Sequence, residues 1–222
     1  MSVSKPSDLV LEYTAQMMAW LLFLQPPARE RVGMLGLGAG SLARFCLRHL
    51  KNQILVVEWN PQVTAVCRQF FRLPSTPRLL IDHEDAGFWV EDPIQQDTLA
   101  VLMVDLYDAE AQGPVRDSLA FYQRCRAVLT QPGVLVVNLF GSHHSFGRNI
   151  RNLSQAFDSR LLFLPQIDEG NQIVLAFSGP QLEVTLSALL ARAEEVESRY
   201  GLPARRWVRS WASRAQAGVL TV

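Results

Sequence analysis

Short apolar segments alternate with helical segments along most of this chain, and this alternation limits the possible folds more than any other feature. The apolar segments have the length and composition of buried strands, and they fall at residues 31–36, 53–58, 78–83, 99–105 and 133–139. Helical periodicity lies between them, at residues 41–50, 61–71 and 118–129. This order predicts a mostly parallel sheet with helices on both faces, a doubly wound, Rossmann-like α/β fold.

One further helical segment and two further strands complete the predicted fold. A helical segment at residues 146–157 precedes two more strands, at 160–164 and 172–177. The polar, Gly-containing residues 168–171 join these two strands, which predicts a hairpin. The sheet then has seven strands, and the terminal hairpin supplies an antiparallel strand at one edge.

The chain divides into three expected parts: a short N-terminal segment, the α/β domain and a C-terminal helix with its tail, at residues 1–30, 31–179 and 180–222. An apolar run in the first part is too short for a bilayer, which needs about 20 residues, so it predicts a buried helix end. The last part is expected to pack on the α/β domain or extend from it. Its final residues, 201–222, form a looser tail in which Trp207 and Trp211 are expected to pack in the core.

Charge and cysteine content exclude several classes of protein. Lys plus Arg and Asp plus Glu both number 21, and a net charge of zero argues against a nucleic-acid surface. Three widely spaced cysteines suit a reducing cytoplasm better than a disulfide framework. The N-terminus lacks the apolar core of a signal peptide, and no zinc-ligand spacing occurs. We therefore expect a cytoplasmic protein that binds no nucleic acid, membrane or metal.

A glycine-rich turn joins the first strand to the first helix of the predicted sheet. Gly36, Gly38 and Gly40 lack side chains, so backbone and ligand can approach closely, and the helix N-terminus offers free N–H groups. The dinucleotide fingerprint needs a glycine where Ser41 stands. The turn therefore favours an S-adenosylmethionine-type nucleoside site over a dinucleotide site.

Two acids follow the next two strands. Glu58 ends the second strand at the distance from the glycines, about 20 residues, at which an acid binds ribose hydroxyls. Its carboxylate can accept two hydrogen bonds from a vicinal diol. Asp85 follows the third strand and could accept from an adenine amino group, although an ordinary polar loop explains it nearly as well. These residues make 31–179 a candidate nucleoside-binding domain.

A second acidic pair follows the fourth strand. Asp105 ends a wholly apolar run, where a carboxylate is costly without a purpose. Asp108 follows three residues later, so both could face one crevice, hold a cationic amine and accept its proton. A turn or a helix cap is the alternative for either residue. The pair His143 and His144, after the fifth strand, is expected to lie in a loop that borders the pocket.

Residues 9–178 together resemble the spermidine synthase (polyamine aminopropyltransferase) family, a branch of the class I S-adenosylmethionine-dependent methyltransferase fold. The segments that carry the resemblance are LEYTAQMM, VGMLGLGAGSLARF, ILVVEWNPQVTAVCRQFF, HEDAGFW, VLMVDLYDAEAQGP, FYQRCRAVLTQPGVLVVNL and GNQIVLAF. The resemblance implies that S-adenosylmethionine or its decarboxylated form is the donor substrate. It places the nucleoside of that donor on Gly36, Gly38, Glu58 and Asp85. It places the acceptor amine near Asp105, at the base position, and Asp108.

Three positions depart from the family pattern. The glycine turn of the family usually reads GGGDG, and its aspartate, which holds the amino group of the decarboxylated donor, is Ala39 here. The tyrosine and glutamate of the family's YxEM segment are Ala15 and Met17. The nucleoside half of the site is therefore retained, while the half that binds amines is changed.

Three functions fit these observations. The first is aminopropyl transfer from decarboxylated S-adenosylmethionine to a diamine or other polyamine. The second is methyl transfer from S-adenosylmethionine, which the missing aspartate favours because that donor carries a carboxylate. The third is a nucleoside-binding or partner-binding module without catalysis. The apolar N-terminal stretch and the tail could each support a homodimer.

Overall fold

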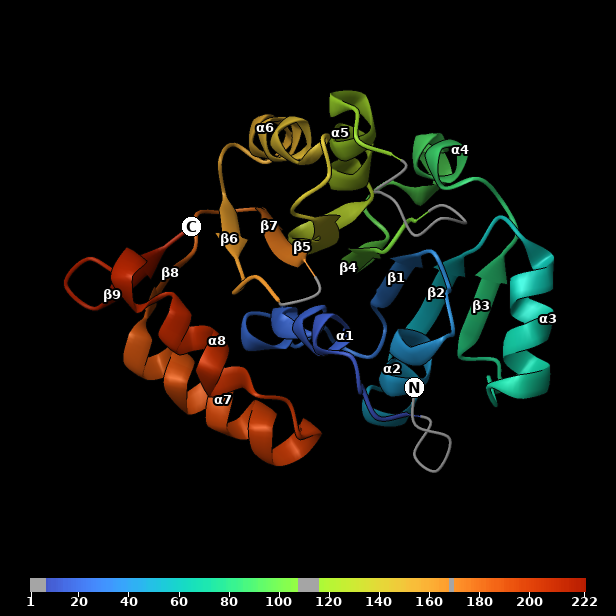
Figure 1. The fold of residues 1–222 in the computed structure, drawn as a ribbon, viewed down its shortest axis with the longest axis horizontal. Coiled ribbons are helices and arrows are strands. Elements are labelled where there is room, and N and C mark those ends of the chain that lie inside the picture. Colours follow the sequence, from blue (N-terminus) through green and yellow to red (C-terminus); the bar gives the residue numbers. More distant parts are fainter. Residues whose placement is uncertain (1–6, 108–115, 168–169) are drawn as a thin grey trace.

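The computed structural model describes residues 7–107, 116–167 and 170–222. One seven-stranded sheet forms its centre, with strand order β3-β2-β1-β4-β5-β7-β6 (Figure 1). The strands are β1 (Arg31–Leu35), β2 (Gln53–Val57), β3 (Leu79–Asp82), β4 (Leu99–Val104), β5 (Leu129–Phe140), β6 (Leu161–Phe163) and β7 (Asn171–Ser178). The predicted doubly wound α/β fold is confirmed.

The terminal hairpin supplies the antiparallel strand of the sheet. β7 pairs antiparallel with β5 on one side and with β6 on the other, whereas β1 to β5 pair in parallel. The antiparallel strand thus lies one place in from the edge, because β6 pairs on its outer side. Since β7 runs against its neighbours, its first residue, Asn171, lies at the carboxyl edge of the parallel strands, opposite Phe140.

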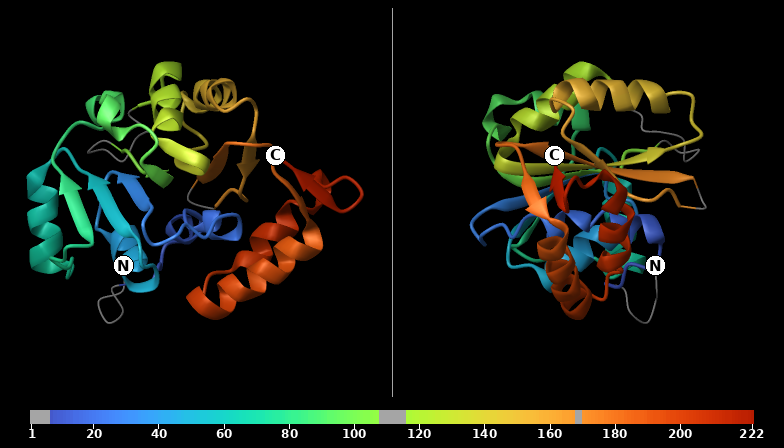
Figure 2. Two further views of the ribbon diagram at one scale, coloured as in Figure 1. Left: turned by 180° about the vertical axis from the view of Figure 1, so that it is seen from behind. Right: turned by 90° about the vertical axis from the view of Figure 1, so that its left-hand side faces the viewer.

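Helices cover both faces of the sheet, and each face has its own apolar cluster (Figures 1 and 2). One face carries α4 (Ala86–Glu91), α5 (Leu119–Ala127) and α6 (Phe146–Ala156). The other carries α1 (Glu12–Gln16), η1 (Ala19–Leu22), α2 (Ser41–His49), α3 (Pro61–Phe70), α7 (Leu186–Tyr200) and α8 (Ala204–Ser210). The strands between these two layers are apolar on both sides because both sides are buried, as in β4, every residue of which is buried.

Local sequence signals set the ends of several helices. The Asn60 side chain accepts a hydrogen bond of 3.0 Å from the Gln62 amide, and Pro61 occupies the first position of α3. Ser118 caps α5 in the same way, through a 3.1 Å bond from the Phe121 amide. The apolar run in the N-terminal segment is buried and ends in η1, as predicted.

The expectation of a loose C-terminal tail is wrong. Residues 201–222 contain α8 and a short strand, β9 (Val219–Thr221), which pairs with β8 (Glu183–Thr185) in a separate two-stranded sheet. Trp207 and Trp211 are each 1% exposed. They belong to the apolar cluster that also includes side chains from one face of the sheet, so the expectation that they pack in the core is confirmed. The Trp211 indole donates a 2.7 Å hydrogen bond to the carbonyl of Phe163 in β6.

We expect Trp211→Ala to lower the free energy of unfolding by about 3–5 kcal/mol, since it removes a large buried side chain from the contact between the C-terminal part and the sheet. Chemical denaturation measures this change. The neighbouring Arg209 is exposed, so Arg209→Ala should stay within about 0.5 kcal/mol of the wild type. Equal stability of the two variants would show that residues 201–222 add nothing to the core.

Candidate functional site

A cavity of about 980 Å³ opens at the carboxyl edge of the parallel strands. This is where open α/β sheets bind their ligands. Its walls come from the loops after β1 to β4, from the first turn of α3, from the end of β5, from α1 and from the start of β7. The lining residues are Tyr13, Gly36, Gly38, Val57, Glu58, Trp59, Asn60, Val63, Glu84, Asp85, Ala86, Asp105, Leu106, Tyr107, Arg116, Asn138, Phe140 and Asn171.

The three predicted glycines differ in their surroundings and in whether they line the cavity. Gly36 has a φ of 93°, and a Cβ built there would lie 2.4 Å from the carbonyl oxygen of Asp105, so only glycine fits. Gly38 has a φ of 52° and open space around it, and it lines the cavity. Gly40 starts α2 beside Arg44 and Leu73 and is not among the lining residues. The structure therefore brings two of the three glycines to the cavity.

Glu58 is 7% exposed and holds two loops of the site together. Its Oε2 accepts a 3.0 Å hydrogen bond from the Leu37 amide in the glycine turn, and its Oε1 accepts another of 3.0 Å from the Asn60 amide. Each carboxylate oxygen can accept a second hydrogen bond. The side chain can therefore hold the glycine turn and still accept bonds from a vicinal diol in the cavity.

Asp85 lines the cavity and also caps α4. Its Oδ1 accepts hydrogen bonds from the amides of Gly87 (2.8 Å) and Phe88 (3.3 Å) and forms an ion pair with Arg116. Burial alone would raise the pKa of the Asp85 carboxyl. The bonds from Arg116 and from the two amides outweigh burial, so the pKa lies below its usual value. An ionised carboxylate at this position can accept from an amino group of a ligand.

Asp105 follows β4 directly, and its amide donates a 3.0 Å hydrogen bond to Leu35 of β1. Its half-buried carboxylate accepts a 2.8 Å bond from Nδ2 of Asn138. Burial raises the pKa of this carboxyl, and the bond from Asn138 acts in the opposite direction without cancelling the rise. A carboxylate with a raised pKa is a stronger base than an ordinary carboxylate, which suits it to accept a proton.

Two tyrosines that sequence reasoning did not single out lie near Asp105. Burial, followed by the charge of Asp105, raises the pKa of Tyr13 to about 12. The same two causes raise the pKa of Tyr107, whose hydroxyl donates a 3.3 Å bond to the carbonyl of Asn138. Both tyrosines therefore keep their protons and can act as hydrogen-bond donors or acceptors in the cavity. Tyr13 lies in the LEYTAQMM segment, which was the one available signal for it.

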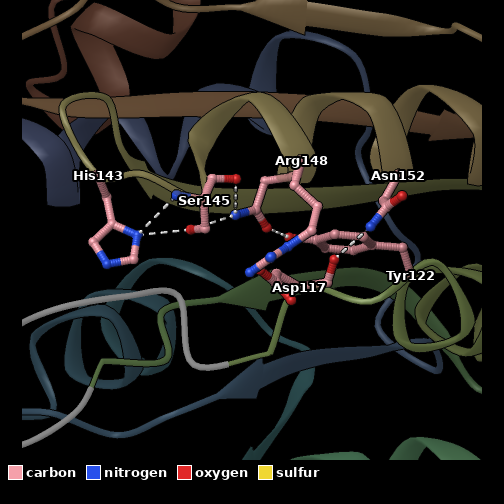
Figure 3. A network of polar contacts seen from close by, with 7 residues as sticks. Asp117, Tyr122, His143, Ser145, Arg148 and Asn152 are labelled. Carbon is pink, nitrogen blue, oxygen red and sulfur yellow. Dashed lines mark hydrogen bonds and ion pairs between the residues drawn. The ribbon is translucent and has the colours of Figure 1, made fainter.

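The remaining predicted residues are Asp108, His143 and His144. Asp108 lies outside the described residues. His143 and His144 are not among the lining residues, so the expectation that they border the pocket is wrong. The His143 ring instead lies 2.7 Å from the Ser145 hydroxyl, at the start of α6 (Figure 3).

The contacts of Ser145 continue into a polar network that joins α6 to α5 (Figure 3). Asn149 donates a 3.1 Å hydrogen bond to the Ser145 hydroxyl and accepts one from the Tyr122 hydroxyl. Arg148 pairs with Asp117 nearby. These contacts hold the two helices together, and none of the residues that make them lines the cavity.

Two features are absent from the described parts of the chain: a cluster of metal ligands and a membrane-spanning helix. No three His, Cys, Asp or Glu side chains come together there as a possible metal site. No helix among these residues is both long enough and apolar enough to cross a membrane.

Two solved structures share this fold. The probable spermidine synthase from Corynebacterium glutamicum superposes with a TM-score of 0.72 at 22% identity, over 97% of this chain and 82% of that one. Human methyltransferase-like protein 13, solved in complex with SAH, gives a TM-score of 0.76 at 23% identity, over 86% and 93% of the two chains. The fold is therefore of the methyltransferase-like class to which spermidine synthases also belong.

Curated relatives define the family more narrowly, although no protein-family model matches the chain. A polyamine aminopropyltransferase of Neisseria meningitidis serogroup A is 32% identical over 211 residues, which cover 93% of this chain and 78% of that protein. One from Chromobacterium violaceum is 33% identical over 204 residues, with 91% and 77% covered. The chain belongs to the polyamine aminopropyltransferase family and is a transferase.

We expect Gly36→Ala to destabilise the protein by about 1–3 kcal/mol through backbone strain, because an L side chain is strained at this φ. The contact of its Cβ with the Asp105 carbonyl should add to this loss. Gly38→Ala also carries a side chain at positive φ but meets open space, so its cost should be smaller, about 1–2 kcal/mol. Thermal or chemical unfolding of both variants measures the difference. Equal losses would mean that the close contact between Gly36 and Asp105 does not constrain the fold.

Proposed function

We propose that the cavity binds the nucleoside of an S-adenosylmethionine-type donor along its glycine-turn side. Glu58 accepts hydrogen bonds from the ribose hydroxyls, and Gly36 and Gly38 let the ligand approach the backbone. Asp85 accepts from the adenine amino group with the oxygen that the helix cap leaves open. The donor proposed first is decarboxylated S-adenosylmethionine, in keeping with the names of the relatives that are 32% and 33% identical.

The acceptor in this proposal is an amine, such as a diamine, that binds on the Asp105 side of the cavity. The Asp105 carboxylate attracts the cationic amine and removes its proton. The amine nitrogen, now neutral, attacks the methylene carbon beside the donor sulfonium. A C–N bond forms, the C–S bond breaks with its electron pair passing to sulfur, and methylthioadenosine leaves. Tyr13 and Tyr107 offer hydrogen bonds that orient the amine.

The observation that carries this proposal is the placement of Asp105. Its backbone is fixed at the end of a central strand, its carboxyl has a raised pKa, and it lines the same cavity as Glu58. A displacement at carbon needs mainly alignment and one proton acceptor. A rigid strand end supplies both requirements better than a mobile loop would.

We expect Asp105→Asn to reduce turnover at least about tenfold, since it keeps the shape of the side chain but removes its charge and basicity. The nucleoside affinity should change by less than about 1 kcal/mol, because Asp105 serves the acceptor. The wild-type rate should rise with pH as the Asp105 carboxyl loses its proton, and this rise should vanish in the variant. Turnover, calorimetry and the melting temperature are measured on the same samples. An unchanged rate per folded molecule would remove Asp105 from the proposed mechanism.

Methyl transfer from intact S-adenosylmethionine is the second candidate, and one position favours it. Ala39 stands where the family pattern has the aspartate that holds the donor's amino group, and its carbonyl accepts a 2.8 Å hydrogen bond from the Arg44 guanidinium. An aspartate would repel the carboxylate of the intact donor, whereas alanine does not. The methyltransferase-like neighbour solved with SAH supports this candidate at the level of the fold.

Ala39→Asp should have opposite effects on the two donors. Ala39 is exposed, so the new carboxylate fits without repacking. We expect the wild type to use the decarboxylated donor with putrescine only weakly. The variant should have a higher kcat/KM for this reaction and a lower affinity for the intact donor. Ala39→Asn is the matched control, since it has the same shape without the charge. If both variants change the two donors alike, Ala39 does not determine the choice of donor.

A further inference from the structure

The antiparallel strand β7 contributes a side chain to the site as well as completing the sheet. β7 lies between β5 and β6 and begins at the carboxyl edge (Figure 1). Its first residue, Asn171, pairs in register with Phe140 at the end of β5, and both line the cavity. A parallel strand in this place would have put its first residue at the opposite edge, far from Asp105.

Asn171 reaches Asp105 through one intermediate amide. Its Nδ2 donates a 2.9 Å hydrogen bond to Oδ1 of Asn138, and Nδ2 of Asn138 donates a 2.8 Å bond to Oδ1 of Asp105. Asn138 is 2% exposed, so its amide depends on these partners. Among the described residues, Oδ2 of Asp105 accepts no hydrogen bond and stays available to a substrate.

The direction of these bonds matters because an amide has a donor end and an acceptor end. If the Asn138 amide turned round, its oxygen would face the Asp105 carboxylate, and two acceptors would oppose each other in a poorly solvated place. The bond from Asn171 to the Asn138 oxygen prevents that orientation. The acceptor-only carboxylate of Asp105 and the donor of Asn171 therefore favour the same orientation of the Asn138 amide, and Asn171 holds the amide in it.

We propose that Asn171 is a positioning residue, which acts through Asn138 to hold the Asp105 carboxylate with one oxygen fixed and the other free for the acceptor amine. This inference rests on the proposed function, because it assumes that Asp105 accepts the proton. Among the described residues, the titratable groups coupled to Asp105 are Tyr13 from α1 and Tyr107 after β4. Since both tyrosines keep their protons, Asp105 is the group of these three that carries a negative charge and can accept a proton.

The test compares Asn171→Leu with the wild type in the full chain. Leucine has nearly the size of asparagine but no donor, so the Asn138 amide is no longer held. The pKa of Asp105 should then rise further, because the bond from Asn138 lowers it in the wild type. On the acid limb of the pH profile, kcat/KM with the amine acceptor should fall about tenfold, with recovery at higher pH. A purely structural role would lower stability and leave the position of the limb unchanged.

Gln172→Leu is the matched control. Gln172 is the next residue of β7, and its side chain donates to the Leu164 carbonyl instead of the site. This variant loses an amide hydrogen bond from the same strand, yet it should leave the Asp105 pKa and the pH profile where they are. A shift as large as that of Asn171→Leu would overturn the proposal.

An NMR titration of the carboxyl carbons in the ligand-free protein separates this inference from the proposed function. A raised Asp105 pKa in Asn171→Leu supports the positioning role even if neither donor is turned over, in which case only the proposed function fails. An unchanged Asp105 pKa overturns the positioning role even if Asp105→Asn abolishes turnover.

Discussion

The glycine turn and the end of β4 touch through backbone atoms, and the rest of the site depends on that contact. A Cβ on Gly36 would lie 2.4 Å from the Asp105 carbonyl oxygen, so the contact exists only because residue 36 has no side chain. The Asp105 amide meanwhile donates to Leu35, the residue before the glycine. The loop proposed to hold the donor and the carboxylate proposed to accept the proton are therefore positioned by one another. A small shift of one strand would move both.

Glu58 extends this arrangement to the neighbouring loop. A buried carboxylate is costly unless it is hydrogen-bonded, and the amides of Leu37 and Asn60 satisfy Glu58 before any ligand arrives. The glycine turn, the loop after β2 and the end of β4 are thus joined without a ligand. A nucleoside would enter a site whose acceptors already point in fixed directions, which lowers the ordering cost of binding.

The sequence predicted the parts of the structure that have a strong local signal. The apolar strands, the glycine turn and the acids at the strand ends follow from residue type and spacing, and all lie at the expected places in the sheet. Tyr13 and Asn171 were missed because they reach the cavity from distant segments, through packing and strand pairing that no local pattern encodes. The structure of residues 201–222 was missed because α8 and β9 are too short to show periodicity, and β9 forms only by pairing with β8.

Among the described residues, four carboxylates line one cavity, and the surroundings of three of them, Glu58, Asp85 and Asp105, give those three different chemistry. Both oxygens of Glu58 receive backbone amides, and Asp85 has an arginine and a helix start, which keep its pKa low. Asp105 has one neutral amide donor, two tyrosines that remain protonated, and burial that raises its pKa. Environments that push the pKa values of neighbouring acids apart are what assign different roles to the same functional group. In the proposed function, Glu58 and Asp85 therefore serve as hydrogen-bond acceptors, and Asp105, which has one neutral donor, is the carboxylate that attracts the cationic amine and takes its proton.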